Sequence, residues 1–422
     1  MSTNGNFGRA TRVLYSFPHR LGTGRIADTA WYQVTGLAKA GAQLTVFTAS
    51  SHKPLPDSVI LKPTLSRGKL RVPYKVLGDM RMFALHDYLV SRKLEKMAAE
   101  VDIVHVWPLG GLRTIQVANR LGIPVVMERP NAHTRFAYEV VQKECERLGV
   151  TLPPDHEHAY KQDVLEREEE EYKLSYRLLC PSDFVVKTFL NYGFPREQLV
   201  RHIYGVDEKT FYPQPAGGSP TGINGVQVTK SGLTALYVGV AAVRKGLHYA
   251  LEAWLKSPAR LTGKFLIAGE FIPSYAEKLA PLLVDPSVHV LGHRNDIPDL
   301  MRKSDMMILP SIEEGFGLVC TEAMASGSVP LVSDACTDIC KHLENALVHH
   351  VGDVAAITQH ITMLHEDRSL LRRLRTAALA AVPQITWDAA GVKLLELYRE
   401  IIEEKQSNTK VKTVQRQAAI DA

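Results

Sequence analysis

Short apolar runs alternate with longer stretches of helical spacing along most of this chain. In the first half, the apolar runs lie at residues 11–17, 44–48, 101–106, 124–128 and 178–181, and stretches of helical spacing lie at 25–40, 112–121 and 183–192. A second series of apolar runs lies at residues 235–238, 264–268, 288–291, 306–309 and 329–332. Such alternation is typical of parallel strands covered by helices on both faces. We therefore predict an α/β fold in which two doubly wound, Rossmann-like domains face each other across a cleft.

The composition between the two series indicates where the domains meet. Residues 213–231 are rich in Gly, Pro, Ser and Thr, which is typical of a linker or a surface loop. We predict a first domain over residues 1–207, a second domain over 208–385, and a C-terminal helix over 386–404. Residues 405–422 are polar and lack a sustained apolar face, so we predict a disordered tail.

Length and composition agree with this organisation. A chain of 422 residues is too long for one ordinary core, which supports two domains. The formal net charge is only +5, and the five cysteines show no paired spacing of a zinc site or disulfide framework. No apolar run reaches the roughly 18 to 20 residues needed to cross a bilayer, and the N-terminus lacks a signal-peptide apolar region. We therefore expect a cytoplasmic protein without a metal site.

The strongest candidate for chemistry follows the predicted strand at 306–309. Glu314 and Glu322 have seven residues between them, beginning with Gly315, Phe316, Gly317 and Leu318. Glycines let a backbone approach a ligand closely, and the start of the helix that follows offers unpaired N–H groups. The loop therefore suits the hydroxyls and phosphates of a nucleotide-activated sugar. Two glutamates at this spacing without the glycine turn would be a weak signal, because helical glutamates usually face water.

This segment resembles the E-x7-E motif of retaining glycosyltransferases of the family-4 type, which have the GT-B fold. The resemblance implies that Glu314 lies near the hydroxyls of the donor sugar and that Glu322 binds the ribose of the nucleotide. It extends from the first predicted strand to about Glu404. It also implies that the predicted C-terminal helix crosses back onto the first domain.

A second candidate follows the predicted strand at 235–238, where Arg244 and Lys245 lie in a loop bounded by glycines. Two cations there would stabilise the negative charge that develops on a departing diphosphate, although such pairs on surface loops often have no role. The loop resembles the family's Gly-Arg-(x)n-Lys-Gly phosphate loop, with Lys245 at its lysine. Val240 stands where many members carry arginine, and Arg244 is the candidate replacement.

Three weaker candidates complete the expected site. His133 follows the predicted strand at 124–128 and resembles the family's first-domain histidine, which implies a contact with the donor sugar or the transition state; a lone histidine is more often structural. Gly22 and Gly24 precede the first predicted helix and form either a diphosphate-binding loop or a plain turn. The loop that contains Arg294 resembles the one with which the family holds the nucleotide base, largely through backbone groups.

The segment around residues 67–75 could attach the protein to a membrane. Arg67, Lys69, Arg71 and Lys75 alternate with apolar residues, and each cation near an anionic surface contributes about 1 kcal/mol. An ordinary amphipathic segment packed on the first domain is the alternative. The sequence gives less support for a nucleic-acid partner, because the chain lacks an aromatic stacking platform and a recognised motif.

From these features we predict a retaining, metal-independent glycosyltransferase that uses a UDP- or GDP-linked sugar as donor substrate and needs no other cofactor. The expected product is a hexosylated saccharide or lipid-linked saccharide in polysaccharide or lipopolysaccharide biosynthesis, made at the inner face of the membrane. Two alternatives are a sugar-nucleotide epimerase of the same fold and a non-catalytic partner subunit. The intact Glu314, Glu322 and Lys245 argue against the partner subunit.

Overall fold

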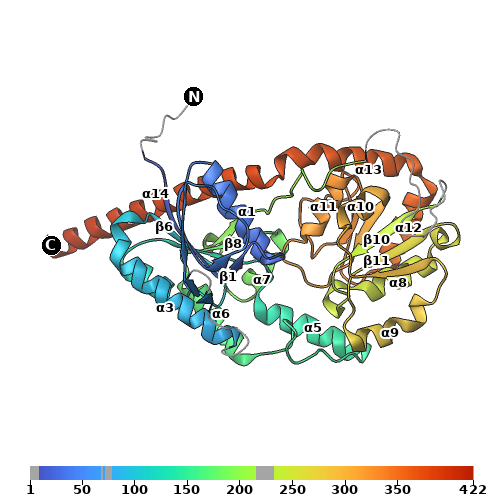
Figure 1. Cartoon of the computed structure of the whole chain (residues 1–422), viewed down its shortest axis with the longest axis horizontal. Coiled ribbons are helices and arrows are strands. Elements are labelled where there is room, and N and C mark those ends of the chain that lie inside the picture. Colours follow the sequence, from blue (N-terminus) through green and yellow to red (C-terminus); the bar gives the residue numbers. More distant parts are fainter. Residues whose placement is uncertain (1–8, 68–69, 72–77, 215–231, 422) are drawn as a thin grey trace.

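The computed structural model describes residues 9–67, 70–71, 78–214 and 232–421. It consists of two parallel β-sheets that lie side by side and are covered by helices (Figure 1). This architecture confirms the predicted fold class. Most of the predicted linker at 213–231 and of the basic segment at 67–75 lies outside the described residues.

The first sheet has seven strands in the order β3-β2-β1-β6-β7-β8-β9, all parallel. Its strands are β1 (Arg12–Leu21), β2 (Gln43–Ser51), β3 (Val59–Pro63), β6 (Ile103–Val106), β7 (Val125–Glu128), β8 (Arg177–Cys180) and β9 (Leu199–Arg201). The helices of this half are α1 (Ile26–Lys39), α3 (Asp79–Met97), α4 (Leu112–Arg120), α6 (Gln162–Leu174) and α7 (Asp183–Asn191). A short hairpin of β4 (Ser66–Arg67) and β5 (Leu70–Arg71) stands apart from the sheet.

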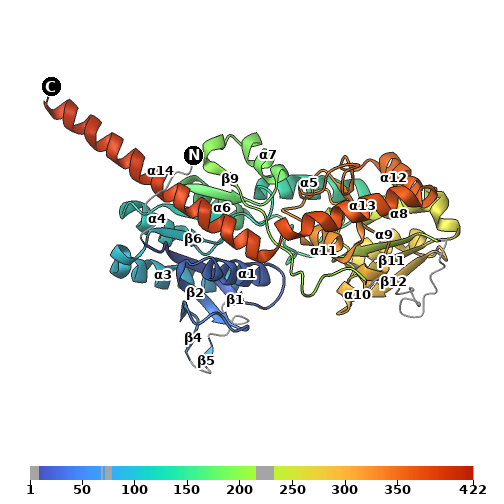
Figure 2. The ribbon, with the colours of Figure 1, turned by 90° about the horizontal axis from the view of Figure 1, so that it is seen from above.

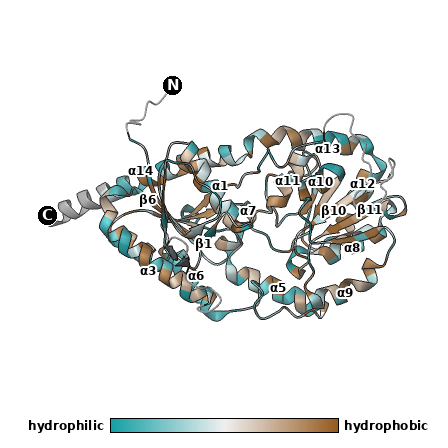
Figure 3. Ribbon diagram, in the orientation of Figure 1, coloured by the Kyte–Doolittle hydropathy of each residue, from teal (hydrophilic) through white to brown (hydrophobic). Residues whose placement is uncertain are grey.

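The second sheet has six parallel strands in the order β12-β11-β10-β13-β14-β15. They are β10 (Thr234–Val238), β11 (Lys264–Ala268), β12 (Val288–Gly292), β13 (Met306–Leu309), β14 (Val329–Ser333) and β15 (Leu347–His349). The helices are α8 (Leu247–Lys256), α9 (Pro273–Leu283), α10 (Ile297–Lys303), α11 (Leu318–Ser326), α12 (Val354–Glu366) and α13 (Arg368–Ala381). Hydrophobic residues concentrate in the strands, and polar residues in the outer faces of the helices (Figure 3).

Sequence periodicity did not predict the strands at the margins of the sheets, namely β3, β9 and β15. Each is a terminal strand with one neighbour, and β9 and β15 have only three residues. Side chains of β3 are mostly exposed, whereas all four residues of the central strand β13 are buried. A buried strand reads as a continuous apolar run, but an exposed or very short one does not.

Helix α5 (Thr134–Leu148) crosses between the two halves, which the predicted boundary at residue 207 did not anticipate. It belongs to the first half by sequence, yet Val141, Cys145 and Leu148 are part of the hydrophobic core around the second sheet. Figure 1 shows α5 below the sheets, beside the second half. Residues 134–148 are therefore shared between the domains.

The last helix, α14 (Trp387–Asp421), extends along the first half (Figure 2). It packs on α1 at Gly36, where an added Cβ would lie 3.1 Å from the Cα of Gly391, and it places Leu394 and Tyr398 in the core of the first domain. The predicted disorder beyond Lys405 is wrong, because the helix continues to Asp421. Residues 405–421 contain neither Gly nor Pro and are rich in Lys, Gln and Ala, which favour helix even without an apolar face.

Among the described residues, no helix is long and apolar enough to span a membrane.

Candidate functional site

The two strongest sequence motifs meet at one edge of the second sheet. Strands β10 and β13 are parallel neighbours, so the loops that follow them emerge at the same edge. This brings the Arg244–Lys245 loop against the Glu313–Glu314 loop, and the backbone N–H of Ile312 donates to the carbonyl of Arg244 at 2.8 Å. The ammonium of Lys245 forms an ion pair and a hydrogen bond with the carboxylate of Glu314.

The second cation of the pair, Arg244, lies between the two glutamates. Its Nη1 donates to the side-chain Oε2 of Glu313 at 2.9 Å and to the backbone carbonyl of the same residue at 3.0 Å. The same nitrogen lies 3.7 Å from Oε1 of Glu314. Burial raises the pKa of Glu314, but Lys245 and Arg244 outweigh burial and hold that pKa below its ordinary value. Glu314 is therefore a charged carboxylate inside the protein.

Glu313 connects this network to the first domain. Its carboxylate is fully buried and accepts the backbone N–H of Ala132 at 3.1 Å, and its Oε2 lies 3.2 Å from Nε2 of His158. Burial raises the pKa of Glu313, but Arg244 and His158 prevail and lower it to about 2. Sequence reasoning gave Glu313 and His158 no role, because their contacts join segments 155 residues apart.

The glycine turn after Glu314 packs against the first domain. A Cβ at Gly315 would lie 1.6 Å from the carbonyl oxygen of Pro130, and the hydroxyl of Ser182 donates to the carbonyl of Gly315 at 2.6 Å. Gly317 has φ of +75° and caps the N-terminus of α11, which explains the glycine there. The close approach at position 315 is therefore made by the first domain.

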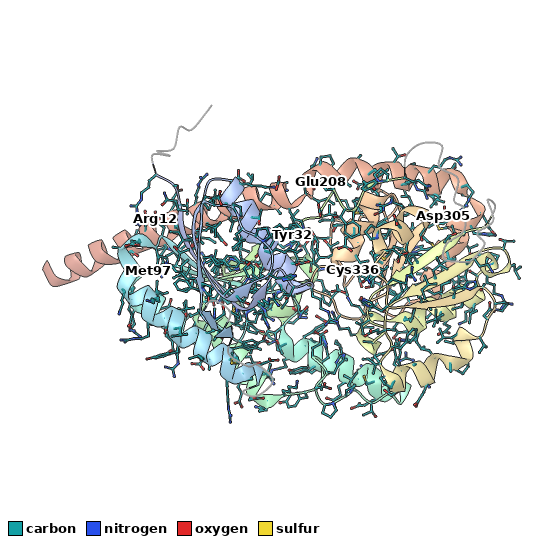
Figure 4. All side chains as sticks on the ribbon, in the orientation of Figure 1. Arg12, Tyr32, Met97, Glu208, Asp305 and Cys336 are labelled. Atoms are coloured by element: carbon teal, nitrogen blue, oxygen red, sulfur yellow. The ribbon has the colours of Figure 1, made fainter. Side chains whose placement is uncertain are left out.

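Phe316 and Leu318, which belong to the predicted loop for a nucleotide-activated sugar, have side chains that pack inside the protein. The ring of Phe316 is 2% exposed and packs against Tyr204, with ring centroids 5.3 Å apart, and Leu318 packs on the same cluster. This cluster also includes Trp387, whose ring stacks on the ring of Tyr32 in α1. Tyr32 is labelled in Figure 4. The side chains of Phe316 and Leu318 are thus occupied by packing between α11, α14 and the first domain.

Glu322 lies on α11, within two turns of the glycine turn. It is half-buried, and among the described residues it has no hydrogen-bond or ion-pair partner. Burial raises the pKa of Glu322 to about 7. A partly buried carboxylate without a partner is a candidate ligand-binding group.

His133 is not part of this network. Its side chain is 1% exposed and stacks on Tyr192, with ring centroids 4.4 Å apart. Its Nδ1 accepts the N–H of Arg135 at 3.3 Å and so caps α5. Burial, with the charges of Arg129 and Arg135, lowers the pKa of His133 to about 3. This placement is structural and argues against the predicted contact with a donor sugar.

The remaining predicted residues lie on other loops. Gly22 and Gly24 follow β1 with φ of +77° and +96°, and the N–H of Gly24 donates to Oδ1 of Asp28 at 3.1 Å. Arg294 follows β12 and donates to Asp296 through Nε and Nη2, at 2.8 and 2.7 Å. In the part of the chain that the structure describes, no group of three or more His, Cys, Asp or Glu residues could hold a metal ion.

A cavity of about 450 Å³ opens on the first domain. Ala132 and His158, which both contact Glu313, contribute to its wall. Leu109, also in the wall, has φ of +66°, a strained conformation for a bulky residue, and its N–H donates to the buried Glu171 at 2.7 Å. The lining also includes the aromatic and polar residues Phe83, Trp107, Asn131, Tyr138, Lys161 and Asp163.

Two parallel-sheet domains with charged groups at their junction are typical of enzymes that bind nucleotide-like ligands. Known family models match both halves: "Glycosyltransferase Family 4" matches residues 26–209, and "Glycosyl transferases group 1" matches residues 232–367. The chain therefore belongs to the group 1 glycosyltransferases of the family-4 type, as its motifs predicted.

Several curated relatives are similar to parts of the chain. The N,N'-diacetylbacillosaminyl-diphospho-undecaprenol alpha-1,3-N-acetylgalactosaminyltransferase of Campylobacter jejuni is 32% identical over 163 residues, which are 37% of this chain and 42% of that protein. The O-antigen chain mannosyltransferase B of Escherichia coli is 25% identical over 231 residues, which are 53% and 60% of the two chains. The chain thus spans about half the length of the curated relatives it matches.

Solved structures match over almost the whole chain. WaaG, a glycosyltransferase involved in lipopolysaccharide biosynthesis, has a TM-score of 0.63 at 16% identity, covering 92% of this chain and 99% of that one. Anabaena HepE in complex with UDP and glucose has a TM-score of 0.62 at 15% identity, covering 92% and 100%. At these identities the likeness establishes the fold, and it confirms the predicted GT-B architecture.

Proposed function

We propose that this protein transfers a hexosyl group from a UDP- or GDP-linked sugar to a hydroxyl of a saccharide or lipid-linked saccharide, with retention of the anomeric configuration. The observation that carries the proposal is the buried pairing of Lys245 with Glu314 at the end of β10 and β13. It supplies a cation for a diphosphate and a carboxylate for sugar hydroxyls within one hydrogen-bonded unit.

The chemistry that suits this arrangement is stabilisation of the leaving diphosphate. Lys245 and Arg244 would oppose the charge that grows on the diphosphate as the bond to the sugar breaks. Glu314 would orient the sugar by accepting hydrogen bonds from its hydroxyls, and Glu322 would accept those of the ribose. The leaving phosphate would take the proton of the acceptor hydroxyl. We propose that the two cations carry out the charge stabilisation without a metal or other cofactor.

The cavity on the first domain is the proposed site of the acceptor. It adjoins the charged network through Ala132 and His158, so an acceptor there would lie close to the reacting centre. Its aromatic walls can pack on the apolar faces of sugar rings, and its polar side chains can bind hydroxyls. Relatives named for lipopolysaccharide, O-antigen and diphospho-undecaprenol substrates support a saccharide acceptor, free or lipid-linked.

The proposed place of action is the cytoplasmic face of the membrane. The basic segment at residues 67–75 would attract an anionic surface, and screening by salt would weaken that attraction. Its residues 68–69 and 72–75 lie outside the described residues, so the proposal rests on the sequence there.

The decisive experiment incubates the protein with radiolabelled UDP- and GDP-sugars, with and without a panel of saccharide and lipid-linked acceptors. We expect label to move to an acceptor, with the anomeric configuration of the donor retained in the product by NMR. Conversion of the donor to another sugar without acceptor would indicate an epimerase instead. If the protein neither binds a donor nor transfers sugar, the proposal is wrong, and the non-catalytic partner subunit remains as the alternative.

A further inference from the structure

The proposed function makes no use of Glu313, although this residue contacts both domains within the charged network. We infer that Glu313 is a positioning residue that fixes the guanidinium of Arg244 at the diphosphate site, and that the first domain controls this position through His158 and Ala132. The inference rests on the proposed function and extends it with a specific role for the domain contact.

Arg244 needs such a partner because of where it lies in the loop. Val240, near the start of the loop, is exposed and carries no charge. Arg244 approaches from the far end of the same loop, on a long and flexible side chain. Two acceptors on Glu313, the carboxylate at 2.9 Å and the carbonyl at 3.0 Å, hold one terminal nitrogen. This fixed nitrogen lies 3.7 Å from Glu314, beside the Lys245 pair.

The composition of the Glu313 site indicates a role beyond stability. A fully buried carboxylate pays a large desolvation penalty, and replacement of a buried ion pair by apolar residues is often neutral or stabilising. Here the buried carboxylate is bound from two sides. Arg244 comes from the second domain, whereas the imidazole of His158 and the N–H of Ala132 come from the first.

This double attachment links donor binding to the contact between the domains. If the first domain moves away, Glu313 loses His158 and Ala132 together and becomes open to water. Glu313 would then be free to rotate, and Arg244 with it. The diphosphate site is therefore complete only when the loop that carries His158 lies against the second domain. Glu157, on the same loop, reinforces this with Oε1 at 3.7 Å from Nε of Arg244.

A double-mutant cycle on the full-length protein tests the inference. Transfer rates and the affinity for UDP and GDP are measured for wild type, Glu313→Gln, Arg244→Ala and the double variant. We expect Glu313→Gln to lower kcat by up to about 100-fold, as a misplaced group does, while the acceptor KM stays near its wild-type value. In the Arg244→Ala background, Glu313→Gln should have almost no further effect. Additive losses would overturn the inference.

Chemical rescue provides a readout that a merely structural role would not change. Millimolar guanidinium chloride should restore part of the activity of Arg244→Ala, because Glu313 holds the free guanidinium in place. It should restore none in the double variant. Equal rescue of both variants would overturn the role of Glu313.

The link to the first domain is tested with His158→Gln, which leaves Arg244 and Glu313 intact. It should reduce kcat in the wild-type background and have no effect in Arg244→Ala. His289→Gln, a histidine on the terminal strand β12, is the matched control and should behave like wild type. If Glu313→Gln does not fold, as judged by its thermal melting, the His158→Gln cycle decides the question.

The outcomes separate the inference from the proposed function. If the wild type transfers sugar but the losses in the double-mutant cycles are additive, only the inference about Glu313 is wrong. If the wild type binds a nucleoside diphosphate but transfers no sugar, the proposed function fails, and the affinity cycles still decide for or against Glu313. A wild type that binds no nucleoside diphosphate overturns both.

Discussion

At the scale of single residues, the chemistry depends on how burial and charge act on three glutamates in one short segment. Glu313 and Glu314 are kept ionised by Arg244 and Lys245, which overcome the effect of burial on their pKa values. Glu322 has no such cation, and burial raises its pKa to about 7. Carboxylates of one loop and of the helix that follows it thus differ in pKa, which suits them to different ligand groups.

Lys245→Ala should lose most transferase activity while the fold is retained. Removing one charge contact to a developing anion costs about 2.7 to 4 kcal/mol, a loss of roughly 100- to 1000-fold in kcat. Steady-state rates at saturating donor measure the effect. Lys256→Ala is the matched control, since Lys256 pairs with Glu252 on the exposed side of α8. Near wild-type turnover of Lys245→Ala would refute the assignment.

The raised pKa of Glu322 predicts two opposite dependences on pH. A folded-state pKa above the ordinary value means that stability is fully present below pH 4.5 and is lost as pH rises through about 7. Binding to ribose hydroxyls instead favours the ionised form, so nucleoside diphosphate affinity should increase from pH 6 to 8. Calorimetry and thermal melting against pH measure the two trends.

Glu322→Gln is the control for both measurements, because it resembles the protonated side chain at every pH. Its gain in melting temperature over wild type should grow from pH 5 to 8. The ionisation of the ligand phosphate also changes the affinity with pH, and this contribution is subtracted first. The remaining increase in nucleoside diphosphate affinity from pH 6 to 8 should be absent in the variant. Identical pH profiles for variant and wild type would show that Glu322 does not contact the nucleotide.

At the scale of elements, the glycine turn before α11 has two separate requirements. Gly317 needs glycine for its backbone conformation, whereas Gly315 needs it because Pro130 of the first domain occupies the space. Gly315→Ala should therefore cost roughly 1 to 3 kcal/mol by overpacking and should also separate the domains. Gly317→Ala should cost roughly 1 to 2 kcal/mol of backbone strain and leave the domain contact intact.

Small-angle scattering and thermal melting distinguish the two glycine variants. The radius of gyration should increase in Gly315→Ala and stay at the wild-type value in Gly317→Ala. An unchanged radius in both variants would mean that the loop of Pro130 can move aside without opening the domains.

The sequence predicted the parts of the site that depend on neighbours along the chain. Lys245 and Glu314 each follow a buried strand, and adjacent parallel strands bring such loops together. Long-range packing decided the rest. His133 was predicted to face a ligand, but Phe189 and Tyr192 of α7 and its C-cap enclose it. Phe316 looked like part of a binding loop, but Tyr204 covers it.

At the scale of the whole molecule, the first and second halves are joined by more than the chain crossing between them. Strand-like pairing of Val206 with Thr386 connects the segments that enter and leave the second domain. Helix α5 adds a third attachment, since its Glu144 lies 2.9 Å from Nε2 of His248 and accepts the hydroxyl of Tyr249 at 2.6 Å. Any opening of the domains must therefore bend the segment between α5 and α6, which also carries His158.

Glu144→Gln should loosen this attachment and make domain closure dependent on ligand. Burial raises the pKa of Glu144, but bonds from His248, Arg147 and Tyr249 prevail and lower it, so its stabilising effect is lost as pH falls. Small-angle scattering should show a larger radius of gyration for the variant than for wild type. Saturating nucleoside diphosphate should then compact the variant more than wild type, because the ligand restores the contact that Glu144 no longer secures.

Glu146→Gln, two residues further along the same helix, is the control for charge loss, since Glu146 bonds only to Gln142 among the described side chains. If Glu144→Gln and Glu146→Gln show the same radius with and without ligand, α5 does not govern the domain contact, and the other contacts between the halves, among them the Val206–Thr386 pairing, the glycine turn and Glu313, must hold it.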